Sequence, residues 1–369
     1  MILKELELKN FRNYDDLKLS FSNNVNIFYG NNAEGKTNIL ESIYFLAITK
    51  SHRTNIDKSL LKNDKLFSKI KGIVESNNNV NKFEILINSK GKSVKINNQT
   101  IKKISNYISK FNVIMFYPND MELIKGNPSI RRKYLNIEIG QVNNKYLSLL
   151  NEYNILIKNR NEYIKNKLFK EIDLNYISTI DEQISKKGAQ IIIIRNQYIN
   201  KININTKNIY NNIFGNGELT IKYKTNIEID NYELENIEKI FYNKLKNNIK
   251  RDNFLGMTYY GPHRDDLTFY IDDIEVKEQS SQGQQRIIVI CMKLGEIEII
   301  KENTKEYPIL LLDDIFSELD ENKKNNILKY LKKEIQTFIT TTDINKISSN
   351  LLKNGNIYLI KNQNIIKKQ

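Results

Sequence analysis

The sequence predicts an α/β protein with an inserted, mainly helical arm, and three observations lead to this prediction. An apolar segment, Val25–Phe28, runs into the glycine-flanked loop Gly30–Gly35 and then into an amphipathic helix that opens on Lys36-Thr37. A second apolar segment, Pro308–Leu312, ends in two carboxylates, a pattern typical of a central parallel strand. Between about Arg131 and Ile202, apolar residues recur at spacings of three and four, which is the helical period.

The loop after the first apolar segment has the residues of a phosphate-binding P-loop. Two glycines let the backbone N–H groups point inward, and the helix N-terminus adds a partial positive charge. Lys36 can reach the β- and γ-phosphates, and the Thr37 hydroxyl can bind Mg²⁺. The simpler alternative is a glycine turn. The strand, loop and helix context favours a nucleotide site, formed by Gly30, Asn31, Asn32, Ala33, Glu34, Gly35, Lys36, Thr37 and Asn38.

Alternating apolar residues predict the strands around this loop. The first half of the chain has predicted strands near 2–10, 17–21, 25–28, 68–75, 82–88, 93–97 and 112–117, of which 68–97 form a meander. The arm follows as two long helices, with apolar stripes at 135–156 and 177–202, which we expect to form an antiparallel hairpin. After it we predict a strand at 219–224, a hairpin through 272–273, a helix from 280 to about 302, strands at 308–314, 337–340 and 357–360, a helix at 321–333 and a basic tail.

We divide the chain accordingly into three parts. Residues 1–125 form the first part of a head that carries the P-loop, residues 126–254 form the arm with its return strand, and residues 255–369 complete the head.

The two acids after the second apolar segment complete the predicted nucleotide site. Asp313 stands where a Walker B aspartate holds Mg²⁺, and Asp314 can orient or deprotonate the attacking water. Lys36 and Asp314 are therefore the candidate catalytic residues. Ser281-Gln282-Gly283-Gln284 opens a helix and can form another anion site, although an ordinary serine N-cap is the alternative.

Composition indicates the class of partner. The chain has 369 residues, a net charge of +14 and a pI near 9.3, which favours polyanions, either nucleic acid or an anionic membrane face. The single cysteine, no signal-peptide pattern and no apolar run of membrane-spanning length lead us to expect a cytoplasmic protein without a membrane partner. Because Asn, Ile and Lys are frequent throughout, we give no weight to Asn clusters as turn signals.

Several motifs, in this order, resemble the ABC-type ATPase head of SMC-like proteins: the P-loop, Ser-x-Gly-Gln, Asp313 and Ser317–Asp320. Five longer segments resemble more closely the RecF family of bacterial recombination mediators, namely Lys50–Thr54, Phe116–Asp120, Lys125–Arg132, Gly261–Asp266 and Ser281–Arg286. The wider ABC pattern has Glu where this chain has Asp314, whereas the RecF family shows the same Asp pair. The usual Gln before the arm has no clear equivalent, and Asn119 or Asp120 can substitute.

The resemblance implies an ATP-dependent DNA-binding protein of recombinational repair, replication restart and the SOS response. Two heads would bind ATP between them, with Ser281, Gly283, Gln284 and Asp320 of one head facing the P-loop of the other. Hydrolysis would be weak and stimulated by DNA, which would be single-stranded or gapped. The implied partners are RecR, RecO and, indirectly, the RecA recombinase. We expect Arg131, Arg132 and Lys133 near DNA, although a structural role at a helix start is the alternative.

Other classes of ATPase carry similar motifs. A cytosolic ATPase subunit of a membrane transporter is the main alternative, but that class normally has no helical hairpin between its P-loop and signature halves. An SMC-like tether needs a much longer coiled coil, and an ATPase fused to a nuclease needs another acidic cluster and domain.

Overall fold

The computed structural model describes the chain except for residues 168–170, 214–216, 316–323, 325–333, 348 and 369. The chain forms two compact units. The first unit consists of Met1–Met121, Asn208–Gly215 and Arg286–Gln369, and the second of Glu122–Lys207 and Asn216–Gln285. The division at residues 125 and 254 remains a prediction about folding domains. The helix expected at 321–333 lies outside the described residues.

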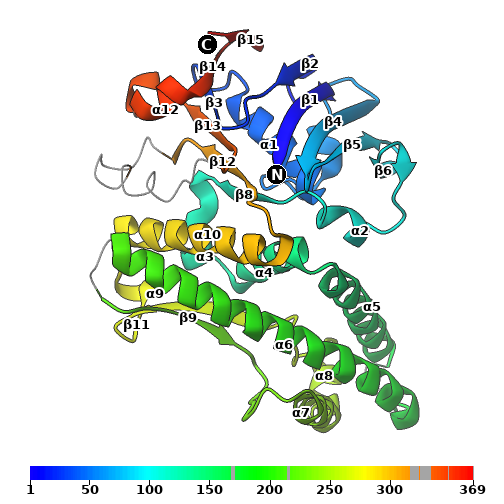
Figure 1. Ribbon diagram of the computed structural model, residues 1–369. Helices are drawn as coiled ribbons and strands as arrows, with labels where there is room; N and C mark the ends of the chain where they lie inside the picture. The colour runs from blue at the N-terminus through cyan, green and yellow to red at the C-terminus, as the bar shows by residue number, and fades with distance from the viewer. Residues whose placement is uncertain (168–170, 214–216, 316–323, 325–333, 348, 369) are drawn as a thin grey trace. The chain divides into compact units, whose positions relative to one another are not determined.

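The first unit contains a mainly parallel sheet, whose strands follow the order β15 (Asn364–Lys367), β14 (Gly355–Lys361), β3 (Val25–Tyr29), β13 (Thr337–Thr341), β12 (Ile309–Asp313) and β8 (Val113–Phe116) (Figure 1). All five residues of β12 are buried, and the strand lies parallel between β13 and β8. This confirms the central parallel strand. The predicted basic tail is partly wrong, because Asn364–Lys367 pair with β14 as an antiparallel edge strand.

A second, fully antiparallel sheet follows the order β2 (Tyr14–Ser20), β1 (Ile2–Phe11), β4 (Phe67–Ser76), β5 (Asn79–Asn88), β6 (Gly91–Ile96) and β7 (Gln99–Thr100). The predicted meander is confirmed. Two of its turns are the pairs Asn77-Asn78 and Asn97-Asn98, in which every residue has a positive φ between 49° and 65°. Asparagine tolerates this region, so these pairs make the tight hairpins that such strands need.

Helix α1 (Lys36–Ile48) contacts strands of both sheets and is buried at every residue from Ile39 to Ile48. We predicted an amphipathic helix here, and that prediction is wrong because two sheets, rather than one, cover the helix. The unit also contains most of α10 (Gln282–Thr304), which begins and ends about two residues later than the helix predicted from 280 to about 302. Its shorter helices are η1 (Asp57–Leu60), α2 (Ser105–Ile108), η2 (Pro118–Met121), η4 (Ile344–Lys346) and α12 (Ser349–Asn354).

The second unit is mainly helical. Its elements are α3 (Glu122–Lys125), α4 (Pro128–Val142), α5 (Asn144–Asn166), most of α6 (Leu174–Ile213), α7 (Leu234–Asn247), α8 (Ile249–Leu255), α9 (Val276–Gln279) and the sheet β11 (Ile274–Glu275), β10 (Asp266–Ile271) and β9 (Leu219–Lys224). The first predicted arm helix is in fact two helices, because the side chain of Asn143 accepts a hydrogen bond from the Tyr146 N–H and caps a new helix, α5.

Helices α5 and α6 form the predicted antiparallel hairpin. Arg160, late in α5, donates to Asp181, early in α6, whereas Arg195, later in α6, donates to Tyr146 at the start of α5. Arg160 is fully buried and also donates to Asp252 of α8 at 2.6 Å and to Thr258 at 2.9 Å. One guanidinium therefore joins three segments of the unit.

Replacing Arg160 with methionine is expected to lower the free energy of unfolding by about 3–5 kcal/mol, because two buried carboxylates lose their cation. Urea denaturation measures this change. The matched control is Lys158→Met on the same helix. Lys158 is exposed and pairs only weakly with Glu162, so its loss is expected to cost less than about 0.5 kcal/mol. Equal losses in the two variants would contradict a structural role for Arg160.

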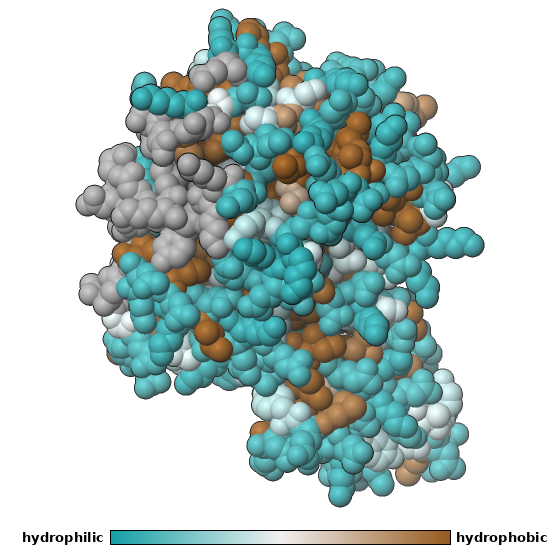
Figure 2. Space-filling model, viewed as in Figure 1, coloured by the Kyte–Doolittle hydropathy of each residue, from teal (hydrophilic) through white to brown (hydrophobic). Residues whose placement is uncertain are grey.

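The surface in Figure 2 is mostly hydrophilic, with hydrophobic side chains scattered among polar ones. In the described part of the chain, we find no helix with both the length and the apolar character needed to cross a bilayer.

Candidate nucleotide-binding site

The loop between β3 and α1 requires its two glycines. Gly30 has φ 153°, and a Cβ atom there would lie 2.3 Å from the carbonyl oxygen of Ile360. Gly35 has φ 107°, and a Cβ atom there would lie 2.6 Å from both Asn13 Nδ2 and the Tyr14 hydroxyl. Side chains are thus excluded at both ends of the loop. Between them, Asn31, Asn32 and Ala33 are exposed.

Lys36 lies over this loop. Its ammonium group donates to the carbonyl oxygens of Gly30 at 2.7 Å and Asn31 at 2.6 Å. Burial lowers the pKa of Lys36, and the nearby carboxylates of Asp314 and Asp313 oppose that shift. The Lys36 cation therefore lies at the loop, where a phosphate-binding loop requires one.

The structure brings Thr37 and Asp313 together from opposite ends of the chain. The Thr37 hydroxyl donates to Asp313 Oδ1 at 2.9 Å, and Thr340 on the neighbouring strand donates to the same oxygen at 2.7 Å. Burial raises the pKa of Asp313, and these two hydrogen bonds oppose the shift. A hydroxyl and a carboxylate oxygen are ligands suited to Mg²⁺, so the donor set fits that ion.

Asp314 follows β12 with a φ of 50°, in the left-handed region. Its N–H donates to the Thr340 hydroxyl at 3.0 Å. Aspartate tolerates this backbone conformation better than most residues with a longer side chain. The local backbone thus gives a physical reason for Asp at a position where the wider ABC pattern has Glu.

Glu41, a buried carboxylate on α1, forms hydrogen bonds with several neighbouring polar groups. Glu41 of α1 accepts from Arg12 at 2.9 and 2.7 Å and from Ser51 at 2.5 Å. Arg53 donates to Asn38 at 2.9 Å, and Asn38 donates to Asn13 at 2.8 Å. Sequence analysis missed this network. The signal was present, since a glutamate inside an apolar helix needs a cationic partner.

Glu41 is expected to make the stability of the first unit sensitive to acid. Burial disfavours its charged form, but the hydrogen bonds from Arg12 and Ser51 outweigh burial and lower its pKa. A lowered pKa in the folded chain means that the carboxylate stabilises the fold above its unfolded pKa. That stability is lost as the pH falls through the folded pKa.

The free energy of unfolding of Glu41→Gln should therefore be about 3 kcal/mol lower at neutral pH. As the pH falls below about 5, that free energy should decline less steeply in the variant than in the parent chain. Urea denaturation at a series of pH values checks this result. Asp15→Asn, which changes an exposed ion pair with Lys62, is the control. Unchanged acid sensitivity in Glu41→Gln would show that other groups control it.

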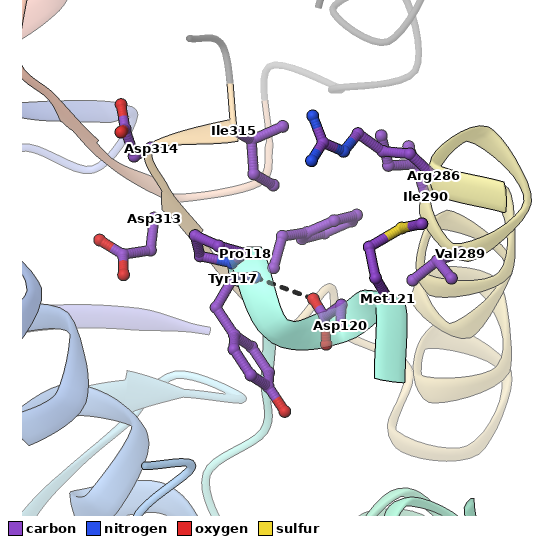
Figure 3. Close-up of a pocket in the computed structure, with 11 residues that line it drawn as sticks. Tyr117, Pro118, Asp120, Met121, Arg286, Val289, Ile290, Asp313, Asp314 and Ile315 are labelled. Atoms are coloured by element: carbon purple, nitrogen blue, oxygen red, sulfur yellow. Dashed lines mark hydrogen bonds between the residues drawn. The ribbon is translucent and has the colours of Figure 1, made fainter. Parts of the chain in front are cut away.

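A pocket lies beside the two Walker B acids in the first unit (Figure 3). Its wall comes from the end of β8, η2, α10 and the end of β12. Asp120 accepts from the Tyr117 N–H at 2.8 Å and pairs with Lys293 at 2.8 Å. These contacts give Asp120 a structural role, while Asn119 is exposed. Of the two candidates for the missing Gln, Asn119 is therefore the one left facing solvent.

The segment Ser281-Gln282-Gly283-Gln284 opens α10 with a capping box. The N–H of Ser281 donates to Gln284 Oε1 at 3.0 Å, and the N–H of Gln284 donates to Ser281 Oγ at 3.2 Å. The serine N-cap that we gave as an alternative is thus present. Gly283 lies in open space, because among the described residues only Ser281 Oγ comes within 4 Å of a Cβ atom built there, at 3.9 Å. Asp320 lies outside the described residues.

Arg131 has a structural role at the start of α4. It is buried, it donates to both carboxylate oxygens of Asp266 at 2.6 and 2.8 Å, and it donates to the Gly126 carbonyl at 2.8 Å. These contacts favour the alternative of a helix-start role over DNA contact. Arg132 and Lys133 are half-buried, and Arg132 donates to the Asp265 carbonyl.

Comparisons with known proteins agree with these motifs. The family described as RecF/RecN/SMC N terminal domain matches residues 2–366. The chain is 42% identical, over the whole of both chains, to the DNA replication and repair protein RecF of Streptococcus thermophilus.

Solved structures give the same picture. The chain resembles the recombination mediator protein RecF with ATP, in the RecFOR pathway, with a TM-score of 0.93 and 34% identity over 100% of this chain and 98% of that one. An Smc head bound to the C-winged helix domain of ScpA has a TM-score of 0.54 and 14% identity over 100% of this chain and 98% of that one, which shows a shared fold alone. The sequence, the site and these comparisons together show that the chain belongs to the RecF family, with an ABC-type ATPase head and a helical arm.

Proposed function

We propose that this protein is an ATP-dependent DNA-binding switch of recombinational repair and replication restart, in which ATP joins two copies of the chain. The P-loop, Lys36 and Asp313 of one copy would bind the nucleotide. Ser281, Gly283 and Gln284 of the second copy would close over the γ-phosphate, together with Asp320. A nucleotide that binds only the joined state shifts the equilibrium towards the dimer.

Gly283 is the observation that carries this proposal. Glycine is a weaker helix former than alanine, and the described residues leave room for a Cβ atom at this position. Among the described residues, nothing therefore requires glycine here for steric reasons. A close approach of another molecule to the helix N-terminus explains the residue, and an anionic phosphate suits that end of a helix.

Thr37 and Asp313 would hold Mg²⁺, which neutralises phosphate charge when bound. Asp314 would accept a hydrogen bond from the attacking water. Because its side chain is one methylene shorter than that of glutamate, we infer slow hydrolysis, which suits a timer more than a motor. We also propose that DNA stimulates hydrolysis. Single-stranded or gapped DNA is the proposed ligand, and the net charge of +14 supports a polyanionic one.

RecR, RecO and, indirectly, RecA are the proposed partners, with a role in the SOS response and a cytoplasmic location. The relatives favour this role over a transporter subunit, since they are named as DNA replication and repair proteins.

The proposal is tested by measuring DNA retention on duplex, single-stranded and gapped substrates with ADP, with ATP and with a non-hydrolysable analogue. We expect tight, salt-sensitive retention with ATP and the analogue, and weak retention with ADP. Sedimentation of the same samples reports dimerisation. Retention and mass that are the same in all three nucleotide states would contradict the switch.

A further inference from the structure

Two cations flank a pair of aromatic rings on one surface of the second unit. Lys244 Nζ lies 5.4 Å from the centre of the Tyr260 ring, the Tyr260 and Tyr259 rings are 5.1 Å apart, and Arg251 Cζ lies 3.8 Å from the centre of the Tyr259 ring. Phe254 lies one turn of α8 beyond Arg251. We name these five residues the aromatic ladder.

The fold holds the ladder open to solvent. Phe254 is 76% exposed and Tyr259 is 38% exposed. Arg251 and Phe254 are three residues apart and so share a face of α8, together with the exposed Leu255. Asp252, on another face of the helix, is buried and bound by Arg160 at 2.6 Å. This buried ion pair fixes the rotation of α8, so the exposure of Phe254 is a consequence of the packed structure.

Cations outnumber acids in the segment that carries the ladder, although α7 also contains Glu235 and Glu238. Residues 239–264 contain six Lys and Arg residues and one acid, the buried Asp252. The end of α5 adds cations, since Lys165 Cγ lies 3.4 Å from a Cβ atom built on Gly256, and Asn253 donates to the carbonyl of Lys167 at 3.2 Å. Lys244 also pairs with Glu228 at 3.1 Å. The surface as a whole attracts a polyanion.

A role in folding alone does not account for these residues. Exposed cation–π pairs stabilise a fold only slightly, and a phenylalanine exposed to this extent contributes little to a core. Aromatic rings beside cations are instead typical of sites that bind single-stranded nucleic acid. The bases have free faces that stack on the rings, and the phosphates bind the cations. A duplex hides its base faces within its own stack and cannot use the rings in this way.

We propose that the aromatic ladder is a stacking site for unpaired bases, which gives the protein a preference for the single-stranded part of its DNA ligand. The inference rests on the proposed function in taking DNA as the ligand. It does not depend on the nucleotide site, because every residue of the ladder belongs to the second unit.

Fluorescence anisotropy of the full chain with labelled oligothymidylate tests the inference. Phe254→Ala and Tyr259→Ala are each expected to weaken oligothymidylate binding by about five- to a hundredfold, the range for loss of one stacked base. Binding to a blunt duplex of the same length is expected to change by less than about twofold. The measurements are made without nucleotide and repeated with ATP.

Two controls isolate stacking. Phe254→Leu keeps an apolar side chain but removes the ring, and it is expected to lose nearly as much affinity as Phe254→Ala. Ile204→Ala removes another exposed apolar residue of the same unit, 59% exposed, and is expected to bind normally. Thermal melting confirms that each variant is folded. Photocrosslinking to iododeoxyuridine in the oligonucleotide is expected to label Phe254 or Tyr259.

Normal oligothymidylate binding by both alanine variants, with crosslinks elsewhere, would overturn the inference. Such a result would mean that the exposed rings serve a protein partner instead. An equal loss for oligothymidylate and duplex would also overturn it, because charge alone would then explain binding. A parent chain that binds oligothymidylate through the ladder but shows no nucleotide-dependent dimerisation would contradict the proposed function and leave this inference standing.

Discussion

Replacing Gly283 with glutamate is expected to abolish ATP-dependent dimerisation and to leave the isolated chain folded. The described residues leave open space at this position, so the larger side chain meets no steric barrier from that part of the chain. Glutamate is also a better helix former than glycine, by about 0.5–1 kcal/mol. In the proposed dimer, however, its carboxylate would lie next to the γ-phosphate of the ATP bound to the other copy. The two negative charges would repel each other.

Sedimentation velocity with ATP and with ADP measures this effect, and thermal melting measures the stability of the monomer. Gly283→Ala is the milder companion, with a raised melting temperature and a weakened dimer. Ile204→Glu places the same charge on an exposed helix position of the same unit and is expected to dimerise normally. A Gly283→Glu chain that still dimerises with ATP would place the nucleotide away from this helix N-terminus.

Lys36→Ala is expected to lower ATP affinity by at least about a hundredfold, since hydrogen bonds to charged groups contribute about 1.5–3 kcal/mol each and this ammonium can make several with the phosphates. Lys36 is buried, and the nearby carboxylates of Asp314 and Asp313 favour its charged form, which is the form that binds phosphate. The variant also loses the bonds to the Gly30 and Asn31 carbonyls, which is expected to cost about 1–2 kcal/mol of stability.

Isothermal titration calorimetry with ATP and Mg²⁺ measures the affinity of the folded variant. Lys50→Ala is the control, because Lys50 is an exposed lysine just after α1. Both variants remove one positive charge from the first unit, so only the position differs. Similar ATP affinity in the two variants would mean that the loop does not bind the phosphates.

Some predictions succeeded because their causes are local. Alternation of apolar residues identified the meander, and the uniformly apolar Pro308–Leu312 identified the central strand. The asparagine clusters were also a local signal for turns, but we gave them no weight, and two hairpin turns of the meander were therefore not predicted. The pairs Asn77-Asn78 and Asn97-Asn98 are hairpin turns, since asparagine accepts a positive φ even in a chain rich in asparagine.

Other predictions failed where packing decides. The stripe from Leu135 to Leu156 reads as one helix, and only the structure shows that Asn143 caps a second one. The sequence of helix α1 predicts an amphipathic helix, and only the second sheet explains why every residue from Ile39 to Ile48 is buried.

The sequence by itself predicted the P-loop, its lysine and threonine, and the acids that follow the central strand, because such a site depends on residue types at short spacings. Tertiary structure alone decided which distant groups meet. It brings Thr37 to Asp313, gives Glu41 the cation of Arg12, and turns Arg131 inward to Asp266. The physical reason is that strand register and helix packing set these contacts, and neither leaves a mark in the local sequence.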